Sequence, residues 1–122
     1  MEKTILIVDD SESIRDVVNF TLENAGYKVL IGIDGSDALK HLSGPEIHLV
    51  ITDFHMPNMD GISLIKEIRA REQHQYVPIL LLTTESQTAK KEEAKAAGAT
   101  GWIVKPFVQD KLLAVVQKLI RS

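Results

Sequence analysis

The sequence predicts an α/β fold in which one doubly wound, five-stranded parallel sheet carries helices on both faces. Five short apolar segments alternate with segments of helical periodicity along the 122 residues. Most of the apolar segments are continuous, which is typical of parallel strands that are buried on both faces. The repeated β–α alternation implies right-handed crossovers and helices on both sides of the sheet. A chain of this length fits one domain, so residues 1–122 are expected to form a single unit.

The expected strands are short runs rich in Ile, Leu and Val. They span residues 4–8, 27–31, 49–52, 79–83 and 102–104. Polar residues follow several of them directly, with Asp9 after the first strand, Asp53 after the third and Lys105 after the fifth. The strand ends are therefore the first place to look for chemistry.

Helices are expected between these strands. The first follows Asp10, where apolar residues from Ile14 to Ala25 form one stripe and Gly26 fits a C-cap. The remaining helices are expected over residues 36–42, 62–71, 87–97 and 110–120. The fourth helix has only alanines for an apolar face, whereas the last directs leucine and valine inward.

Composition excludes several classes of protein. A formal net charge of −3 argues against a nucleic-acid-binding surface, because no excess of basic residues is present to neutralise phosphates. The absence of cysteine removes disulfides, thiolate metal sites and thiol catalysis. No run approaches the ~20 apolar residues that a membrane helix needs, and acidic residues interrupt the amino terminus before a secretory segment is complete. The expectation is a soluble cytoplasmic protein with no membrane insertion.

Polar residues at the carboxyl ends of the strands are the candidates for a functional site. Doubly wound sheets with strand order 2-1-3-4-5, adopted here as a template, bind ligands at this edge. The residues that the template brings together there are Asp9, Asp10, Asp53, Thr83, Thr84 and Lys105. Carboxylates ~4 Å apart repel each other by ~4 kcal/mol at an effective dielectric constant near 20. Lys105 and a hard divalent cation with oxygen ligands, such as Mg²⁺, would offset that repulsion.

An aspartate beside such a cation and a lysine can act as a nucleophile toward a phosphoryl group. The two positive charges stabilise the negative charge that spreads over the transferring oxygens. Asp53 is the candidate nucleophile, and the Thr83 hydroxyl is placed to bind one of those oxygens.

Each of these residues also has a purely structural interpretation. The segment 9–11 can cap the first helix, Thr83 and Thr84 are equally good caps, and Lys105 can simply end a strand before a proline. The pair at positions 60 and 61 is expected to form a turn and start a helix. The joint placement of carboxylates and a lysine on one edge favours a site. The four histidines are scattered in the sequence, which argues against a histidine metal cluster.

Four segments carry a resemblance to a known family. They are LIVDD (residues 6–10), VITDFHMPNMDG (50–61), LLTT (81–84) and GATGWIVKPF (98–107). Together they resemble the receiver domain of bacterial response regulators over essentially the whole chain. The resemblance implies the CheY-like, flavodoxin-like version of the doubly wound fold, with strand order 2-1-3-4-5.

The resemblance also implies a role for each acidic residue. Asp53 would be the phosphoacceptor, and Asp9 and Asp10 would form the acidic pair. Mg²⁺ would be held by this pair, by Asp53 and by the backbone carbonyl of His55.

Three further positions match the family pattern. Thr83 would contact the phosphoryl group, Lys105 would pair with the acyl phosphate, and the Lys105–Pro106 peptide would be cis. The position of the family's switch aromatic, usually Tyr or Phe, is Trp102 here. Indole is bulkier than those rings and its N–H requires a partner, which leaves the usual inward rotation in question.

The function implied by the resemblance is a phosphorylation-dependent switch of a two-component system. The chain ends at Ser122, just past the last helix, so the first expectation is a stand-alone regulator of the chemotaxis CheY type or a phosphorelay shuttle. It would accept a phosphoryl group from a histidine kinase or histidine phosphotransfer protein and signal to a target protein, such as a flagellar motor switch component. It would be monomeric when unphosphorylated, and its only catalysis would be its own phosphorylation and dephosphorylation.

Three alternatives remain open from the sequence. A small Mg²⁺-dependent phosphatase of the haloacid-dehalogenase type also uses an aspartyl nucleophile, but its second aspartate is replaced by His55 here. A flavodoxin shares the fold but has a phosphate-binding loop after the first strand, where Asp9 and Asp10 would repel a phosphate. The third alternative is a receiver fragment of a larger regulator.

Overall fold

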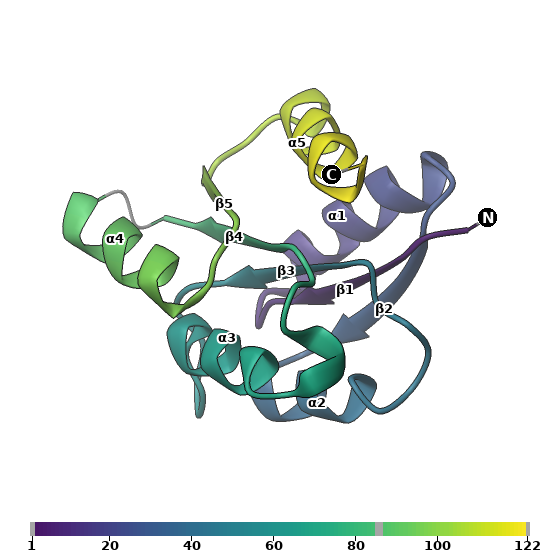
Figure 1. Ribbon diagram of the computed structural model, residues 1–122. Helices are drawn as coiled ribbons and strands as arrows, with labels where there is room; N and C mark the ends of the chain where they lie inside the picture. Colours follow the sequence, from purple (N-terminus) through teal and green to yellow (C-terminus); the bar gives the residue numbers. More distant parts are fainter. Residues whose placement is uncertain (1, 85–86, 122) are drawn as a thin grey trace.

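One parallel sheet with helices on both faces organises the molecule (Figure 1). The computed structural model describes residues 2–84 and 87–121. Within them the five strands lie in the order β2-β1-β3-β4-β5, all parallel, as predicted. Helices α1 and α5 cover one face, and α2, α3 and α4 cover the other.

The strands lie within one residue of their expected positions. They are β1 (Thr4–Val8), β2 (Lys28–Gly32), β3 (Leu49–Asp53), β4 (Ile79–Thr83) and β5 (Gly101–Val104). Strands β1, β3 and β4 are buried at every residue, which agrees with their continuous apolar sequences. The edge strands β2 and β5 are partly exposed.

The helices also agree with the sequence, apart from their ends. They are α1 (Glu12–Asn24), α2 (Gly35–His41), α3 (Gly61–Arg69), α4 (Thr88–Ala97) and α5 (Gln109–Arg121), with a short 3₁₀ helix η1 (Glu72–His74). The expectation of a helix over residues 62–71 was too long at its end, and η1 was not foreseen. Arg69 explains this end, because its guanidinium donates to the carbonyls of His74 and Val77 and folds the following segment back onto the helix.

The two ends of α1 show how local sequence sets these boundaries. Ser11 is the N-cap, and its hydroxyl accepts a hydrogen bond from the Ile14 amide at 3.4 Å. At the other end Gly26 adopts φ 95°, and the amides of Gly26 and Tyr27 bond to the carbonyls of Glu23 and Leu22. This is a Schellman ending, and it takes Tyr27 out of the expected strand, so β2 begins one residue later.

The side chains of the sheet divide into two apolar clusters, one on each face. Along β1, Leu6 and Val8 pack toward α2, α3 and α4, whereas Ile5 and Ile7 pack toward α1 and α5. This rigid sheet fixes the strand ends relative to one another. Among the described residues, no helix has the length and apolar character needed to cross a membrane.

Candidate functional site

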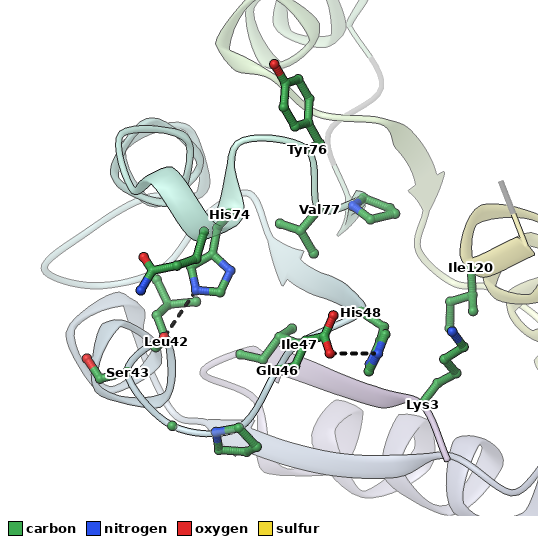
Figure 2. Close-up of a pocket in the computed structure, with 14 residues that line it drawn as sticks. Lys3, Leu42, Ser43, Glu46, Ile47, His48, His74, Tyr76, Val77 and Ile120 are labelled. Carbon is green, nitrogen blue, oxygen red and sulfur yellow. Dashed lines mark hydrogen bonds and ion pairs between the residues drawn. The ribbon is translucent and has the colours of Figure 1, made fainter. Parts of the chain in front are cut away.

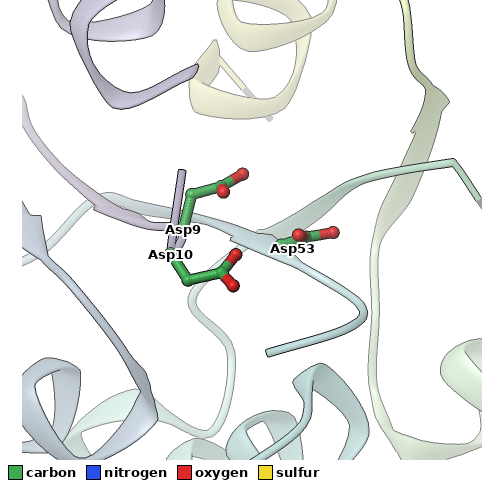
Figure 3. A group of neighbouring side chains, drawn as sticks. All are labelled: Asp9, Asp10 and Asp53. Atoms are coloured by element: carbon green, nitrogen blue, oxygen red, sulfur yellow. The ribbon is translucent and has the colours of Figure 1, made fainter. Parts of the chain in front are cut away.

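Three carboxyl groups meet at the carboxyl ends of β1 and β3. Asp9 and Asp10 follow β1, and Asp53 ends β3. Each offers an oxygen that lies within 4.8 Å of the others. Figure 3 shows the three side chains pointing to the same side of the strand ends. The sequence-based expectation that these residues converge is confirmed.

Asp53 is oriented by the loop that follows it. Its Oδ1 accepts a hydrogen bond from the Phe54 amide at 2.7 Å, and the Gly61 amide donates to the Phe54 carbonyl at 2.8 Å. The loop thus folds back on the end of β3. A Cβ at position 61 would lie 2.5 Å from the Asp53 carbonyl oxygen, so only glycine fits this close approach. Asp60 caps α3 by accepting from the Ser63 amide at 2.8 Å, as the turn interpretation predicted.

Asp9 is the most constrained of the three carboxylates. Its Oδ1 accepts from the Ser11 amide at 2.9 Å, and its Oδ2 accepts from the Lys105 ammonium at 2.9 Å. Lys105 follows β5, and its Nζ also lies 3.4 Å from Asp53 Oδ2. One lysine therefore bridges two carboxylates, and the interpretation of Lys105 as a mere strand end is incomplete. The Lys105–Pro106 peptide is cis, as the resemblance implied.

Burial raises the pKa of Asp53 above its usual value of 3.8, and burial is the largest cause. The Lys105 ammonium acts in the opposite direction, the Asp9 carboxylate raises the pKa further, and the Phe54 amide lowers it. The repulsion between carboxylates that the sequence predicted is thus a smaller cause of this pKa shift than desolvation. Asp53 therefore holds its proton to higher pH than a surface aspartate does.

The donor set fits a magnesium ion. All members of the cluster are carboxylates, and neither histidine nor cysteine joins any such group within the described residues. Hard oxygen ligands with room for water are what Mg²⁺ takes in proteins. His55 lies in the exposed part of the same loop, two residues after Asp53. The other three histidines are engaged elsewhere, at Ile31, Thr4 and Leu42.

Thr83 and Thr84 lie at the end of β4, beside this cluster. Thr83 is fully buried, and its carbonyl accepts from the Lys105 amide at 2.7 Å. Neither threonine caps α4, because the N-cap is Gln87. The capping interpretation of Thr83 and Thr84 is therefore wrong.

Trp102 lies on the opposite face of β5 from Ile103, because successive side chains of a strand alternate between its faces. Its ring packs edge-on against Phe54, with centroids 5.9 Å apart, and the Lys91 ammonium lies over it. Its Nε1 is buried and has no hydrogen-bond partner among residues 2–84 and 87–121. The sequence-based expectation that the indole N–H has a partner is therefore not met by the described residues. A buried N–H that finds no partner generally costs about 1–3 kcal/mol.

Sequence reasoning missed the groups that bond to the acidic residues, both at their carboxylates and at their backbone. The amides of Ser11 and Phe54 are backbone donors, and the type of residue at a position does not indicate whether its backbone amide bonds to a carboxylate. The Arg15 guanidinium, which donates to the Asp9 carbonyl at 2.7 Å, looked like an ordinary helix residue.

A groove of about 710 Å³ lies at the other end of the sheet (Figure 2). Lys3, His48 and Pro78, which line it, directly precede β1, β3 and β4. Because these are the amino-terminal ends of the strands, the groove is remote from the carboxylates. It shares no residue with the acidic cluster.

Comparison with known proteins identifies the family. The model of the response regulator receiver domain matches residues 5–117. Chemotaxis protein CheY-3 of Vibrio cholerae is 39% identical over 116 residues, which cover 94% of this chain and 89% of that protein. The alkaline phosphatase synthesis transcriptional regulatory protein PhoP of Bacillus subtilis is 36% identical over 99% of this chain, which spans 50% of PhoP.

Solved structures show the same similarity. Chemotaxis protein CheY4 of Vibrio cholerae superposes with a TM-score of 0.94 and 44% identity, covering 98% of this chain and 99% of that chain. The receiver domain of sensor histidine kinase PA1611 from Pseudomonas aeruginosa superposes with a TM-score of 0.91 and 30% identity over 100% of both chains. That structure contains a magnesium ion coordinated in the active site cleft.

Proposed function

Since this chain belongs to the family of response regulator receiver domains, we propose that its phosphorylation switch operates through a phosphoryl group on Asp53. The chain is a signalling protein rather than an enzyme, and Mg²⁺ is its cofactor. The observation that carries the proposal is the position of Asp53 in the carboxylate cluster, 3.4 Å from Lys105.

Asp53 suits the nucleophile's role better than its neighbours do. Both oxygens of Asp9 are engaged, and its side chain is only 2% exposed. Asp10 is exposed and lacks a contact with Lys105. Asp53 has one oxygen held by the Phe54 amide, while the other lies within reach of the ammonium, and its side chain is 12% exposed. It therefore combines a fixed orientation with an oxygen that a phosphoryl donor can approach.

The transfer itself exchanges one bond to phosphorus for another. An Asp53 oxygen forms the new bond, the bond to the histidine nitrogen of the donor breaks, and that nitrogen retains the electron pair. Lys105 keeps Asp53 in the ionised, nucleophilic form against the effect of burial, and then pairs with the acyl phosphate. Asp9, Asp10, Asp53 and the His55 backbone carbonyl would hold Mg²⁺. When bound, the ion offsets the charge on the transferring oxygens.

Thr83 and Trp102 would convert the new group into a signal. Thr83 ends β4 beside the cluster, so its hydroxyl would bind a phosphoryl oxygen. Trp102 contacts Phe54, the neighbour of the phosphoacceptor, and within the described residues its N–H has no partner that would hold the ring in place. A rearrangement of this ring on phosphorylation would alter the surface formed with α4.

The phosphoryl donor of a receiver domain is a histidine kinase, reached directly or through a histidine phosphotransfer protein. Similarity to two chemotaxis proteins over nearly their whole length supports a role in chemotaxis. The downstream partner would then be a protein such as a flagellar motor switch component, with the chain acting in the cytoplasm as a monomer until it is phosphorylated.

Acetyl phosphate with Mg²⁺ tests the phosphoacceptor. Intact mass should show one added phosphoryl group, and peptide mapping should place it on Asp53. The Asp53→Ala variant should remain unlabelled, whereas Asp60→Ser, which removes another loop carboxylate and keeps an N-cap, should label normally. Labelling of Asp53→Ala at the normal rate and extent would refute the assignment.

A further inference from the structure

Arg15 makes an unusual contact for a residue in the first turn of α1. Its guanidinium nitrogen Nη1 donates to the backbone carbonyl of Asp9 at 2.7 Å. The side chain is half-buried and, within residues 2–84 and 87–121, forms no ion pair with a carboxylate. A charge-assisted hydrogen bond of this length is a strong one. Arg15 therefore acts on the backbone of the acidic loop and not on its carboxylates.

Asp10 is the member of the cluster that needs such support. Asp9 is held by the Ser11 amide and Lys105, and Asp53 by the Phe54 amide. The Asp10 carboxylate is exposed, and no hydrogen bond or ion pair to another described residue fixes it. Its direction is therefore determined by the backbone from which it projects.

The carbonyl that Arg15 contacts belongs to the peptide group that joins Asp9 to Asp10. Because a peptide group is planar, a bond to its oxygen restricts rotation on both sides, including the backbone of Asp10. The Asp9 amide is bonded to the Gly32 carbonyl at 3.3 Å, and the Ser11 amide is bonded to Asp9 Oδ1. The hydrogen bond from Arg15 to the Asp9 carbonyl adds a third restraint on the backbone between the Asp9 amide and the Ser11 amide.

We propose that Arg15 is a positioning residue that fixes the Asp9–Asp10 peptide and thereby directs the Asp10 carboxylate toward the magnesium site. This inference rests on the proposed function of the cluster. Outer-shell groups that orient metal ligands commonly change metal affinity 10–100-fold when they are removed.

Charge and geometry predict opposite effects of removing Arg15. If the guanidinium acted only as a nearby positive charge, its loss would make the site more attractive to a cation, and Mg²⁺ would bind more tightly. If the Arg15 guanidinium positions Asp10, its loss leaves the Asp10 carboxylate unoriented. Mg²⁺ then binds more weakly, although the electrostatic potential at the site is more negative. The sign of the change therefore separates the two roles.

The experiment is calorimetric titration of wild type, Arg15→Met and Arg15→Gln with MgCl₂. We expect both variants to bind Mg²⁺ about 10-fold more weakly than wild type. Lys111→Met is the matched control, because it removes an exposed positive charge that is not bonded to the loop, and its affinity should be equal to or slightly tighter than wild type. Equal or tighter binding by the folded neutral Arg15 variants would overturn the proposal.

A second readout needs no metal. In the magnesium-free protein, amide hydrogen exchange at Asp10 and Ser11 should accelerate in Arg15→Met, while exchange at Ile7 in β1 stays unchanged. Unchanged exchange at Asp10 and Ser11 would also count against positioning. If wild type itself fails to bind Mg²⁺, the proposed function of the cluster fails, and the exchange result still decides whether Arg15 orders the loop.

Discussion

Removal of the Lys105 ammonium should destabilise the magnesium-free protein more than any surface charge change does. Its Nζ lies 2.9 Å from Asp9 Oδ2 and 3.4 Å from Asp53 Oδ2. The side chains of Lys105, Asp9 and Asp53 are 13%, 2% and 12% exposed, so solvent screens these contacts poorly. The Lys105→Met variant keeps the aliphatic length and leaves both carboxylates without their counter-charge.

The magnitude follows from these distances. At an effective dielectric constant of ~20, each contact contributes roughly 5 kcal/mol of gross attraction, most of which offsets desolvation. Removing one partner of a buried ion pair typically costs about 3–5 kcal/mol. Lys105 is the main influence that lowers the pKa of Asp53, so its loss raises that pKa further, and protonation of Asp53 limits the cost. We therefore expect a loss of ~3 kcal/mol at pH 7, or roughly 10 °C in Tm for a domain of this size.

The assay is thermal unfolding with and without Mg²⁺ between pH 4 and pH 7. A carboxyl group whose folded-state pKa is raised contributes stability at low pH and loses it as pH rises through that pKa. The difference between wild type and Lys105→Met should therefore be largest at pH 7 and shrink toward pH 4. Saturating Mg²⁺ should also reduce the difference, because the ion replaces the missing positive charge. A variant as stable as wild type at pH 7 without Mg²⁺ would refute the reasoning.

Three other predictions follow from the same cluster. Asp53→Asn should raise the Tm of the magnesium-free protein at pH 7, because the raised pKa of Asp53 shows that its ionised form is unfavourable in the folded protein. This gain in Tm should vanish below the usual aspartate pKa of 3.8, where the carboxyl group is protonated in both the folded and the unfolded state. Asp10→Asn should remove most of the stabilisation by Mg²⁺, which for wild type is ~2.7 kcal/mol at a concentration 100-fold above Kd. Beryllofluoride with Mg²⁺ should shift the fluorescence emission of Trp102, the only tryptophan in the sequence, and Thr83→Ala should weaken that shift. Unchanged emission at saturating beryllofluoride would show that the indole is static.

The sequence was sufficient to predict the strands of the sheet, because strands that are buried on both faces have continuous apolar sequences whatever the details of their packing. It was also sufficient for the acidic cluster, since parallel strands bring their carboxyl ends to one edge. Helix ends were less certain. The end of α3 depends on Arg69, whose guanidinium also donates at 2.7 Å to the carbonyl of Gly98, distant in sequence, and no local pattern indicates such a bond.

Polar contacts inside the site were harder to predict for a related reason. In the sequence, Arg15 looks like an ordinary exposed helix residue. Only the path of the chain after β1 brings the Asp9 carbonyl within reach of its guanidinium. The Trp102 N–H is the opposite case, in which a hydrogen bond was expected from the sequence and is not found among the described residues. General rules predict that a buried donor finds a partner, yet this one has none in the part of the chain that the structure describes. Violations of such rules are expected at functional or strained sites, and Trp102 contacts Phe54, the neighbour of Asp53.

Strand β5 connects the two halves of the switch. Its alternation directs Trp102 toward α4 and Phe54, while Lys105, just beyond its end, reaches Asp9 and Asp53. The Lys105 amide also donates to the Thr83 carbonyl at 2.7 Å, so the ends of β4 and β5 are bonded to each other beside the carboxylates. Under the proposed function, a phosphoryl group that draws Lys105 or Thr83 would therefore pull on the short strand that carries the indole. The indole N–H has no hydrogen-bond partner among the described residues, so a displacement of β5 is the route by which the proposed switch would favour a second position of the ring.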